Sequence, residues 1–206
     1  GYGGALSGPV RVDPAGHTAA DVGDEPLMMA AQVPVIVSRE RVEGAALARA
    51  QGATIALLDD GFQNPALIKD ASLIVIDEAR GIGNGCVFPA GPLRAPLPPQ
   101  IARTDALIVI GTGESADGIA TSARTSGASV LRARLVPDQA SLDQLRGQRV
   151  LAFAGIGDPA RFFATLRSSG VDVIEERIFA DHHPFTPDEI GRLASAGAAK
   201  SLMLVT

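Results

Sequence analysis

The sequence has few of the residues that mark several classes of protein. It contains one cysteine, Cys86, no tryptophan, and 4% aromatic residues. A single cysteine excludes a framework of disulfides within the chain and fits a reducing compartment. We interpret Cys86 as a small loop or core residue in preference to a nucleophile. No apolar run is long enough to cross a bilayer as a helix.

Lysine is also scarce, which bears on nucleotide binding. Only Lys69 and Lys200 are lysines among 18 basic residues. A Walker A loop, G-x-x-x-x-G-K-[ST], needs a lysine that opens a helix after a glycine-rich turn. Lys69 lies in a stretch without glycines, and Lys200 leads into the strand-like run 201–206. An ATP-binding interpretation therefore requires a phosphate loop before Gly1, and we expect the chain to be a fragment of a longer protein.

The balance of charge is acidic. The formal net charge is −5 over 206 residues, which argues against a general nucleic-acid binder because such proteins need a basic surface for phosphates. Apolar residues make up 46% and charged residues 20%, as in a folded chain. The length suits one large α/β domain, or a medium domain with a small one.

Short apolar runs of strand type recur along the first two thirds of the chain. They are Val33–Val37, Ile55–Leu58, Leu73–Asp77 and Ala106–Ile110. Helix-like stretches, such as the alanine-rich segment 42–51, separate them. This spacing predicts an α/β fold with a parallel sheet that carries helices on both faces.

The pattern changes near residue 130. Val130–Val136 alternates with arginines, as in an exposed strand or a connecting ribbon, and Val150–Ala154 begins a second α/β unit. We therefore predict three parts: a core domain over residues 1–130, a connecting ribbon over 131–149, and a smaller α/β domain over 150–206.

The stretch Leu57–Asn64 places two carboxylates, Asp59 and Asp60, directly after a predicted strand. Open α/β sheets bind ligands at the carboxyl ends of their strands, and acids there can hold Mg²⁺ or orient a nucleophile. Two acids beyond a strand are also typical of a solvated turn or a helix cap. The residues alone leave both interpretations open.

Other polar residues also have two interpretations each. Asp24 and Glu25 precede Pro26, so they either favour the start of a helix near Asp24 or supply a base for a substrate hydroxyl. Arg39 and Arg41 follow a predicted strand, where they either clamp a phosphate or begin a solvated helix.

His182 and His183 lie in a loop between a predicted strand and helix. They are either exposed loop histidines or include one that pairs with a carboxylate for proton transfer. Adjacent residues rarely face one ion, so a metal site made from these two is disfavoured.

Gly111–Gly113 follows a strand, but Ala116 stands where the third glycine of the dinucleotide-binding fingerprint is required. Gly155–Gly157 fits the variant fingerprint through Ala160, but Pro159 removes a phosphate-facing N–H, which favours a tight strand-to-helix turn.

Six motifs occur in a fixed order along the chain. They are Gly23-Asp24-Glu25-Pro26, Asp59-Asp60-Gly61-Phe62-Gln63, the residues 79–85 (ARGIGNG), the residues 89–94 (PAGPLR), Phe153-Ala154-Gly155-Ile156-Gly157, and Asp181-His182. This ordered set resembles the tetraacyldisaccharide 4′-kinase family, the lipid A kinases of Gram-negative bacteria. The opening residues 1–4 match the end of that family's Ser-Arg-Gly-Tyr-Gly-Gly motif.

The resemblance implies a P-loop kinase fold at the cytoplasmic face of the bacterial inner membrane. Such a kinase transfers the γ-phosphate of ATP to the 4′-hydroxyl of an acylated disaccharide 1-phosphate. The implied cofactors are ATP and Mg²⁺. The implied partners are the lipid substrate and a membrane surface contacted peripherally, with no nucleic acid.

The resemblance also implies roles for particular residues. Asp24 is the expected catalytic carboxylate, paired with His182, and Glu25 is a supporting position. A second set belongs to the nucleotide side: Asp59 and Asp60 for magnesium, Gln63 in the nucleotide-handling loop, and Arg39 and Arg41 facing phosphate.

The chain departs from the family pattern at two positions. Asn64 stands where a histidine is expected, and Ala95 stands where many relatives have glutamate. Because the Walker A segment is missing, the fragment alone is expected to be inactive. The alternatives are another P-loop small-molecule kinase, a GTPase-like nucleotide switch, or a non-catalytic interaction domain.

Overall fold

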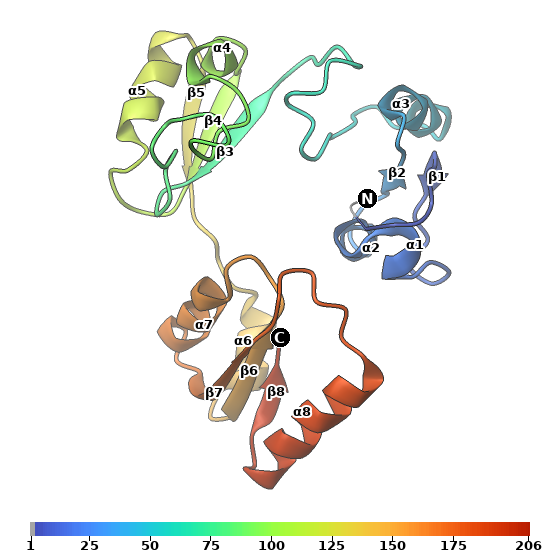
Figure 1. The fold of residues 1–206 in the computed structure, drawn as a ribbon, viewed down its shortest axis with the longest axis vertical. Helices are drawn as coiled ribbons and strands as arrows, with labels where there is room; N and C mark the ends of the chain where they lie inside the picture. The colour runs from blue at the N-terminus through green and yellow to red at the C-terminus, as the bar shows by residue number, and fades with distance from the viewer. Residues whose placement is uncertain (1–2) are drawn as a thin grey trace. The chain divides into compact units, whose positions relative to one another are not determined.

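The computed structural model describes residues 3–206, so Gly1 and Tyr2 of the opening motif lie outside the described residues. The chain divides into two compact units, Gly1–Leu135 and Val136–Thr206 (Figure 1). Residues 131–149, expected as a connecting ribbon, contain the end of a strand and helix α6 (Gln139–Leu145). Leu142 and Leu145 of α6 pack against a core of the second unit.

The first unit begins with a small antiparallel sheet and three helices. β1 (Val10–Arg11) pairs with β2 (Ile36–Val37), and the helices are α1 (Ala19–Val22), α2 (Asp24–Ala30) and α3 (Arg41–Ala50). The helix expected near Asp24 is confirmed. The expectation that Val33–Val37 joins the parallel sheet is wrong, because its strand portion pairs with β1.

The prediction of a strand at Ile55–Leu58 is wrong. This segment has no regular secondary structure, and the side chains of Ile55 and Leu57 are 79% and 91% exposed. Its composition suits a strand, but a strand also needs a neighbour that accepts and donates backbone hydrogen bonds. Within residues 3–206, no strand pairs with it.

A three-stranded parallel sheet follows, as the sequence predicts. β3 (Leu73–Asp77), β4 (Ala106–Ile110) and β5 (Ser129–Ala133) pair in that order. Helices α4 (Leu97–Ile101) and α5 (Asp117–Thr125) share a core with one face of this sheet. This core contains Ile76, Leu107 and Val109 from the strands, and Ile101, Ile119 and Ala123 from the helices.

The opposite face of this sheet is apolar and exposed in the described part of the chain. Leu73, Val75 and Leu131 are 49%, 58% and 53% exposed. Strands buried on both faces read as continuous apolar runs, which explains why the sequence predicted helices on both sides. The α/β class is confirmed, but within residues 3–206 the helices that pack on this sheet lie on one face.

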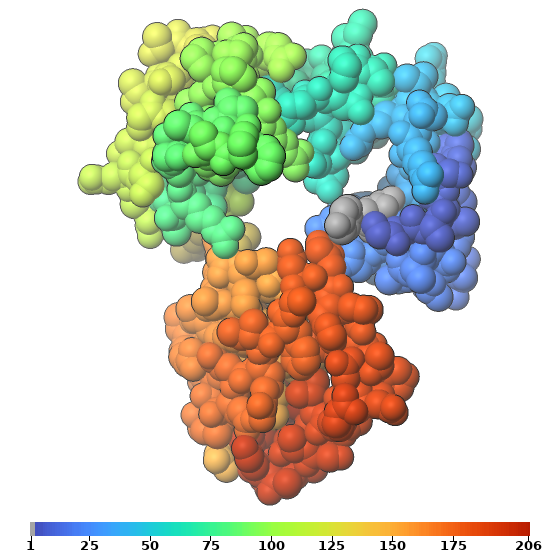
Figure 2. Space-filling view, in the orientation of Figure 1, coloured from blue at the N-terminus to red at the C-terminus, as the bar shows by residue number. Residues whose placement is uncertain are grey.

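The second unit is a parallel sheet with helices on both faces. β6 (Arg149–Ala154) lies between β7 (Asp172–Ile178) and β8 (Met203–Val205). Helices α6 and α7 (Pro159–Ser168) bury one face, and α8 (Pro187–Ala199) buries the other. The space-filling view shows this unit, orange to red, as one filled body (Figure 2).

Candidate functional site

Asp59 and Asp60 lie in an exposed turn that two arginines hold. The Arg94 Nη1 donates to both carboxylate oxygens of Asp60 at 2.7 Å. The Arg41 Nη1 donates to the Asp59 carbonyl oxygen at 3.5 Å. The hydrogen bond to Asp60 and the charge of its carboxylate raise the pKa of Arg94. The structure thus brings Arg41 and Arg94 to the turn. Arg94 belongs to one of the sequence motifs, but no role was predicted for it.

A buried glutamine joins this turn to α4. The Gln63 Nε2 donates to the Gln100 Oε1 at 2.8 Å, and the Gln100 Nε2 donates to the Ala95 carbonyl oxygen at 2.6 Å. The Arg103 guanidinium lies 5.6 Å from the ring centroid of Phe62, as in a cation–π contact. Gln100 therefore links the Asp-Asp turn to the segment that carries Arg94. No sequence motif identified Gln100.

The backbone of the turn explains part of its sequence. Asp60 has φ of +49°, a left-handed conformation that aspartate and asparagine tolerate better than most residues. Asn64, which replaces the expected histidine, accepts from the Ala66 N–H through Oδ1 at 2.8 Å and from the Lys69 Nζ through its carbonyl at 2.5 Å. Asn64 thus stabilises the segment after the turn.

The turn offers carboxylate oxygens of the kind that Mg²⁺ binds, but not a complete set of metal ligands. Among the described residues, no group of three or more His, Cys, Asp or Glu side chains is placed to bind a metal. Mg²⁺ in nucleotide sites is often held by one or two carboxylates, with water and substrate phosphates as the remaining ligands. Asp59 and Asp60 supply such oxygens, and Arg94 shares the carboxylate of Asp60.

Asp24 and Glu25 lie exposed in the first turn of α2. The start of this helix rests on the glycine motif, since a Cβ on Gly4 would come within 2.6 Å of the Val22 carbonyl carbon. Backbone bonds from Ala5 and Leu6 to Ala20 and Asp21, both 2.9 Å, hold the two segments together. Gly4 therefore lets the opening segment pack closely against the residues just before Asp24. Arg39 follows β2, is exposed, and donates its backbone N–H to the Ser7 carbonyl at 2.8 Å.

In the second unit, the parallel strands β6 and β7 bring two loops to one edge of the sheet. The loops are 155–158 and 179–183, and the His182 N–H donates to the Gly155 carbonyl at 3.0 Å. His182 is exposed and has φ of +55°. Asp158 accepts from the Arg161 N–H at 3.1 Å and caps α7. The Gly-Ile-Gly stretch is therefore a strand-to-helix turn, as predicted.

The two neighbouring histidines differ. His183 is half-buried, and its Nε2 lies 3.1 Å from the Glu189 Oε1. Its ring stacks on Phe179 and meets Phe185 edge-on, with centroids 5.0 and 4.8 Å apart. The interpretation of both histidines as exposed loop residues is therefore wrong for His183. His182 and Asp24 belong to different units, so their pairing stays a prediction.

The carboxylate of Glu189 accepts hydrogen bonds on both oxygens. The Thr186 N–H and Oγ1 donate to Oε2 at 3.0 and 2.9 Å. The Thr186 N–H, the Thr186 hydroxyl and the neighbouring His183 lower the pKa of Glu189. Glu189 is therefore anionic at neutral pH, and it both caps α8 and holds His183.

A buried carboxylate at the end of β3 is a feature that sequence reasoning missed. Glu78 is 2% exposed, and its Oε1 accepts from the Ala116 N–H at 3.0 Å. Its Oε2 lies 3.3 Å from the Arg132 Nη1, while Arg132 also bonds Asp117 at 2.7 Å. Glu78 ties the carboxyl end of β3 to the start of α5 and to β5. In the sequence, the one sign of this role is that Glu78 directly follows the apolar run Leu73–Asp77.

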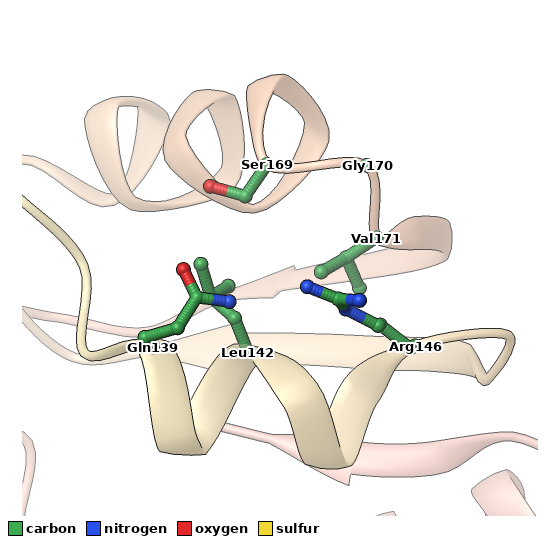
Figure 3. A pocket seen from close by; sticks show the side chains of 6 residues that line it. All are labelled: Gln139, Leu142, Arg146, Ser169, Gly170 and Val171. Carbon is green, nitrogen blue, oxygen red and sulfur yellow. The ribbon is translucent and has the colours of Figure 1, made fainter.

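A cavity of about 250 Å³ lies elsewhere in the second unit (Figure 3). Its lining residues are Gln139, Leu142, Arg146, Ser169, Gly170 and Val171. Figure 3 shows side chains of α6 facing the turn that ends α7. The turn at residues 169–171 directly precedes β7, whereas His182 follows the carboxyl end of β7. The cavity and His182 therefore lie at opposite ends of this strand.

Comparison with known proteins places the chain in a family. The sequence model described as "LpxK: Tetraacyldisaccharide-1-P 4'-kinase" matches residues 1–206. A tetraacyldisaccharide 4′-kinase of Rhodopseudomonas palustris (strain ATCC BAA-98 / CGA009) is 69% identical over all 206 residues, which cover 61% of that relative. One of Nitrobacter winogradskyi is 66% identical, again with 61% of its length covered. The chain thus spans about three fifths of these relatives.

A solved structure agrees with this assignment. It is described as the "apo" form of LpxK from Aquifex aeolicus in complex with ATP. The two chains are 28% identical with a TM-score of 0.67, and the match covers 91% of this chain and 63% of the other. The chain belongs to the tetraacyldisaccharide-1-phosphate 4′-kinase family.

Proposed function

We propose that the chain acts within a 4′-kinase that transfers the γ-phosphate of ATP to the 4′-hydroxyl of an acylated disaccharide 1-phosphate. The observation that carries this proposal is the family match over residues 1–206, which includes the Asp-Asp turn between Arg41 and Arg94. A match of this extent favours the lipid kinase over another P-loop kinase, a nucleotide switch or a non-catalytic domain. The Aquifex aeolicus relative with ATP supports the nucleotide.

The nucleotide side of the site comprises the Asp-Asp turn and its neighbours. Asp59 and Asp60 hold Mg²⁺, which neutralises charge on the phosphates when it is bound. Arg39 and Arg41 face phosphate, and Gln63 belongs to the nucleotide-handling loop. Arg94 holds the Asp60 carboxylate at 2.7 Å, and so keeps the turn formed before nucleotide arrives.

The acceptor side requires a proton acceptor, because a sugar hydroxyl is a poor nucleophile. Asp24 takes this proton, with Glu25 as a supporting carboxylate in the same helical turn. His182 pairs with Asp24 and orients its carboxylate or shares its proton. Both residues are exposed, as groups that meet a substrate must be.

The substrate also suggests where the enzyme works. Among residues 3–206, no helix is both long and apolar enough to cross a membrane. We propose peripheral contact with the cytoplasmic face of the bacterial inner membrane, because an acylated disaccharide resides in a lipid surface. Nucleic acid is not a proposed partner, given the net charge of −5.

The test is phosphate transfer from ATP to the acylated disaccharide 1-phosphate by the full-length protein. Asp24→Asn keeps the size of the side chain and removes the base, so turnover should fall at least about 100-fold. Glu43→Gln, on the exposed face of α3, is the matched control and should leave turnover unchanged. No transfer by the unmodified protein would refute the proposed reaction, whereas normal turnover of Asp24→Asn would refute only the role of Asp24.

A further inference from the structure

The loop that carries His182 is fixed by its neighbour, His183. The His183 ring is 24% exposed and is held on three sides, by Glu189 at 3.1 Å and by the rings of Phe179 and Phe185. Phe179 and Phe185 contact Phe153 of β6, with centroids 6.4 and 5.4 Å away. His183 is thus anchored to the core of the second unit.

The backbone beside His183 has an unusual conformation. His182 has φ of +55°, which L-residues other than glycine, asparagine and aspartate adopt rarely. Such a conformation persists only where the surrounding structure fixes it, and it is concentrated at functional sites. The His183 N–H donates to Ala180 at 3.1 Å, so the turn closes on either side of His182.

Gly155 provides the space for this turn. A Cβ on Gly155 would lie 3.1 Å from the His183 Cβ and 3.1 Å from the Ala180 carbonyl oxygen. The backbone just after β6 therefore approaches the His183 side chain and the turn directly. The turn at Gly155–Gly157 and the turn at Asp181–His183 therefore pack against each other.

Glu189 fixes His183 from the other side. Its Oε2 accepts from Thr186 and its Oε1 meets His183, so one carboxylate joins the first turn of α8 to the loop. Leu193, one helical turn further along α8, is buried with Phe153 in the same core. The position of α8 therefore restrains His183, the residue next to His182.

We propose that His183 and Glu189 are positioning residues for His182: the pair fixes the Asp181–His183 turn and so presents His182 for its part in phosphate transfer. The inference rests on the role proposed for His182 and assigns no contact between His183 and a substrate. Displacing a catalytic group by about 1 Å can reduce turnover about 100-fold, so a positioning pair affects kcat more than substrate binding.

The experiment measures kcat and KM of full-length protein carrying His182→Ala, His183→Ala, or both. His183→Ala should lower kcat at least about tenfold and leave both KM values within about twofold. Because His183 acts through His182, the double variant should be no slower than His182→Ala alone. His183→Phe keeps ring packing and loses the bond to Glu189, so it should lower kcat even if His183→Ala fails to fold.

The control separates positioning from general loss of stability. Asp138→Ala removes the cap of α6, where the Asp138 carboxylate accepts from the Ser141 N–H at 2.8 Å, and should leave kcat within about twofold. Normal kcat for both His183 variants would overturn the inference. It would also be overturned if the loss of kcat in the double variant were the product of the losses in His182→Ala and His183→Ala, because the two residues would then act independently. Normal kcat for His182→Ala would instead overturn the proposed role of His182.

Discussion

Arg94 and Asp60 form an ion pair in which the Arg94 Nη1 lies 2.7 Å from each carboxylate oxygen of Asp60. The two residues are 34 positions apart, and the pair connects the Asp-Asp turn to the segment before α4. Because both side chains are mostly exposed, the pair adds little to stability. The pair fixes the Asp60 carboxylate, which we propose as a magnesium ligand.

Replacing Asp60 should remove magnesium-dependent turnover. In full-length protein, Asp60→Ala deletes a hard oxygen ligand and leaves Arg94 without its partner, so kcat should fall at least about 100-fold at any Mg²⁺ concentration. A magnesium titration of initial rates measures this. Asp70→Ala, at another exposed position, is the control. A titration curve identical to that of the unmodified enzyme would remove Asp60 from the metal site.

Replacing Gln100 should destabilise the Asp59-Asp60 turn. Gln100→Ala removes a buried side chain with its bonds to Gln63 and Ala95, and leaves the carbonyl of half-buried Ala95 without its donor, so the free energy of unfolding should fall by about 1–3 kcal/mol. The KM for ATP should rise as well, since Gln63 loses its fixed partner. Urea unfolding and steady-state rates provide both measurements. Gln51→Ala, exposed after α3, should change neither quantity.

Removing the buried carboxylate of Glu78 should destabilise the first unit. Glu78→Ala leaves the buried Ala116 N–H without its acceptor and leaves Arg132 with Asp117 alone, so the free energy of unfolding should fall by about 1–3 kcal/mol. Hydrogen exchange should rise in β5 and at the start of α5, while the second unit keeps its protection. A change below about 0.5 kcal/mol would show that Glu78 is not a structural anchor.

Lowering the pH should destabilise the second unit, in part because Glu189 becomes protonated. Its pKa is lowered from 4.5 in the folded state, chiefly by the Thr186 N–H. The unfolded chain therefore takes up this proton first. The stabilisation from ionised Glu189 is fully present above pH 4.5 and is lost as the pH falls through the lower folded value.

The variant Glu189→Gln isolates this contribution. Urea midpoints measured from about pH 6 to about pH 3 should fall less steeply for Glu189→Gln than for the unmodified protein. The pKa of Asp138 is also lowered, by hydrogen bonds from Ser141, and this effect remains in both proteins as an internal reference. Parallel curves for the two proteins would contradict this account of Glu189.

Local patterns were sufficient for many elements of the fold. The apolar runs at β4 and β6 were predicted because a central strand of a parallel sheet is apolar on both faces, and β3, at the edge of the same described sheet, has the same apolar composition. Helix α8 was predicted from Thr186 and Glu189, whose capping box needs only neighbouring residues. The ordered motifs, from Asp24 to His182, led to the family that the comparisons then showed.

Other features required contacts between distant residues. The segment 55–58 has the composition of a strand, but pairing depends on a partner strand that composition cannot supply. The pairs Asp60–Arg94 and Gln63–Gln100 join positions 34 and 37 residues apart, so no local pattern identifies them.

The sequence alone determined the α/β class, the order of the motifs and the residue types available for phosphate transfer, because these depend on side-chain chemistry and short-range periodicity. The tertiary structure decided which of two adjacent histidines is held and which is exposed. The motif singled out His182 but did not predict the burial of either histidine, and packing of Phe179, Phe185 and Glu189 around the His183 ring is what separates them. That distinction arises from contacts made only when β6, β7 and α8 come together.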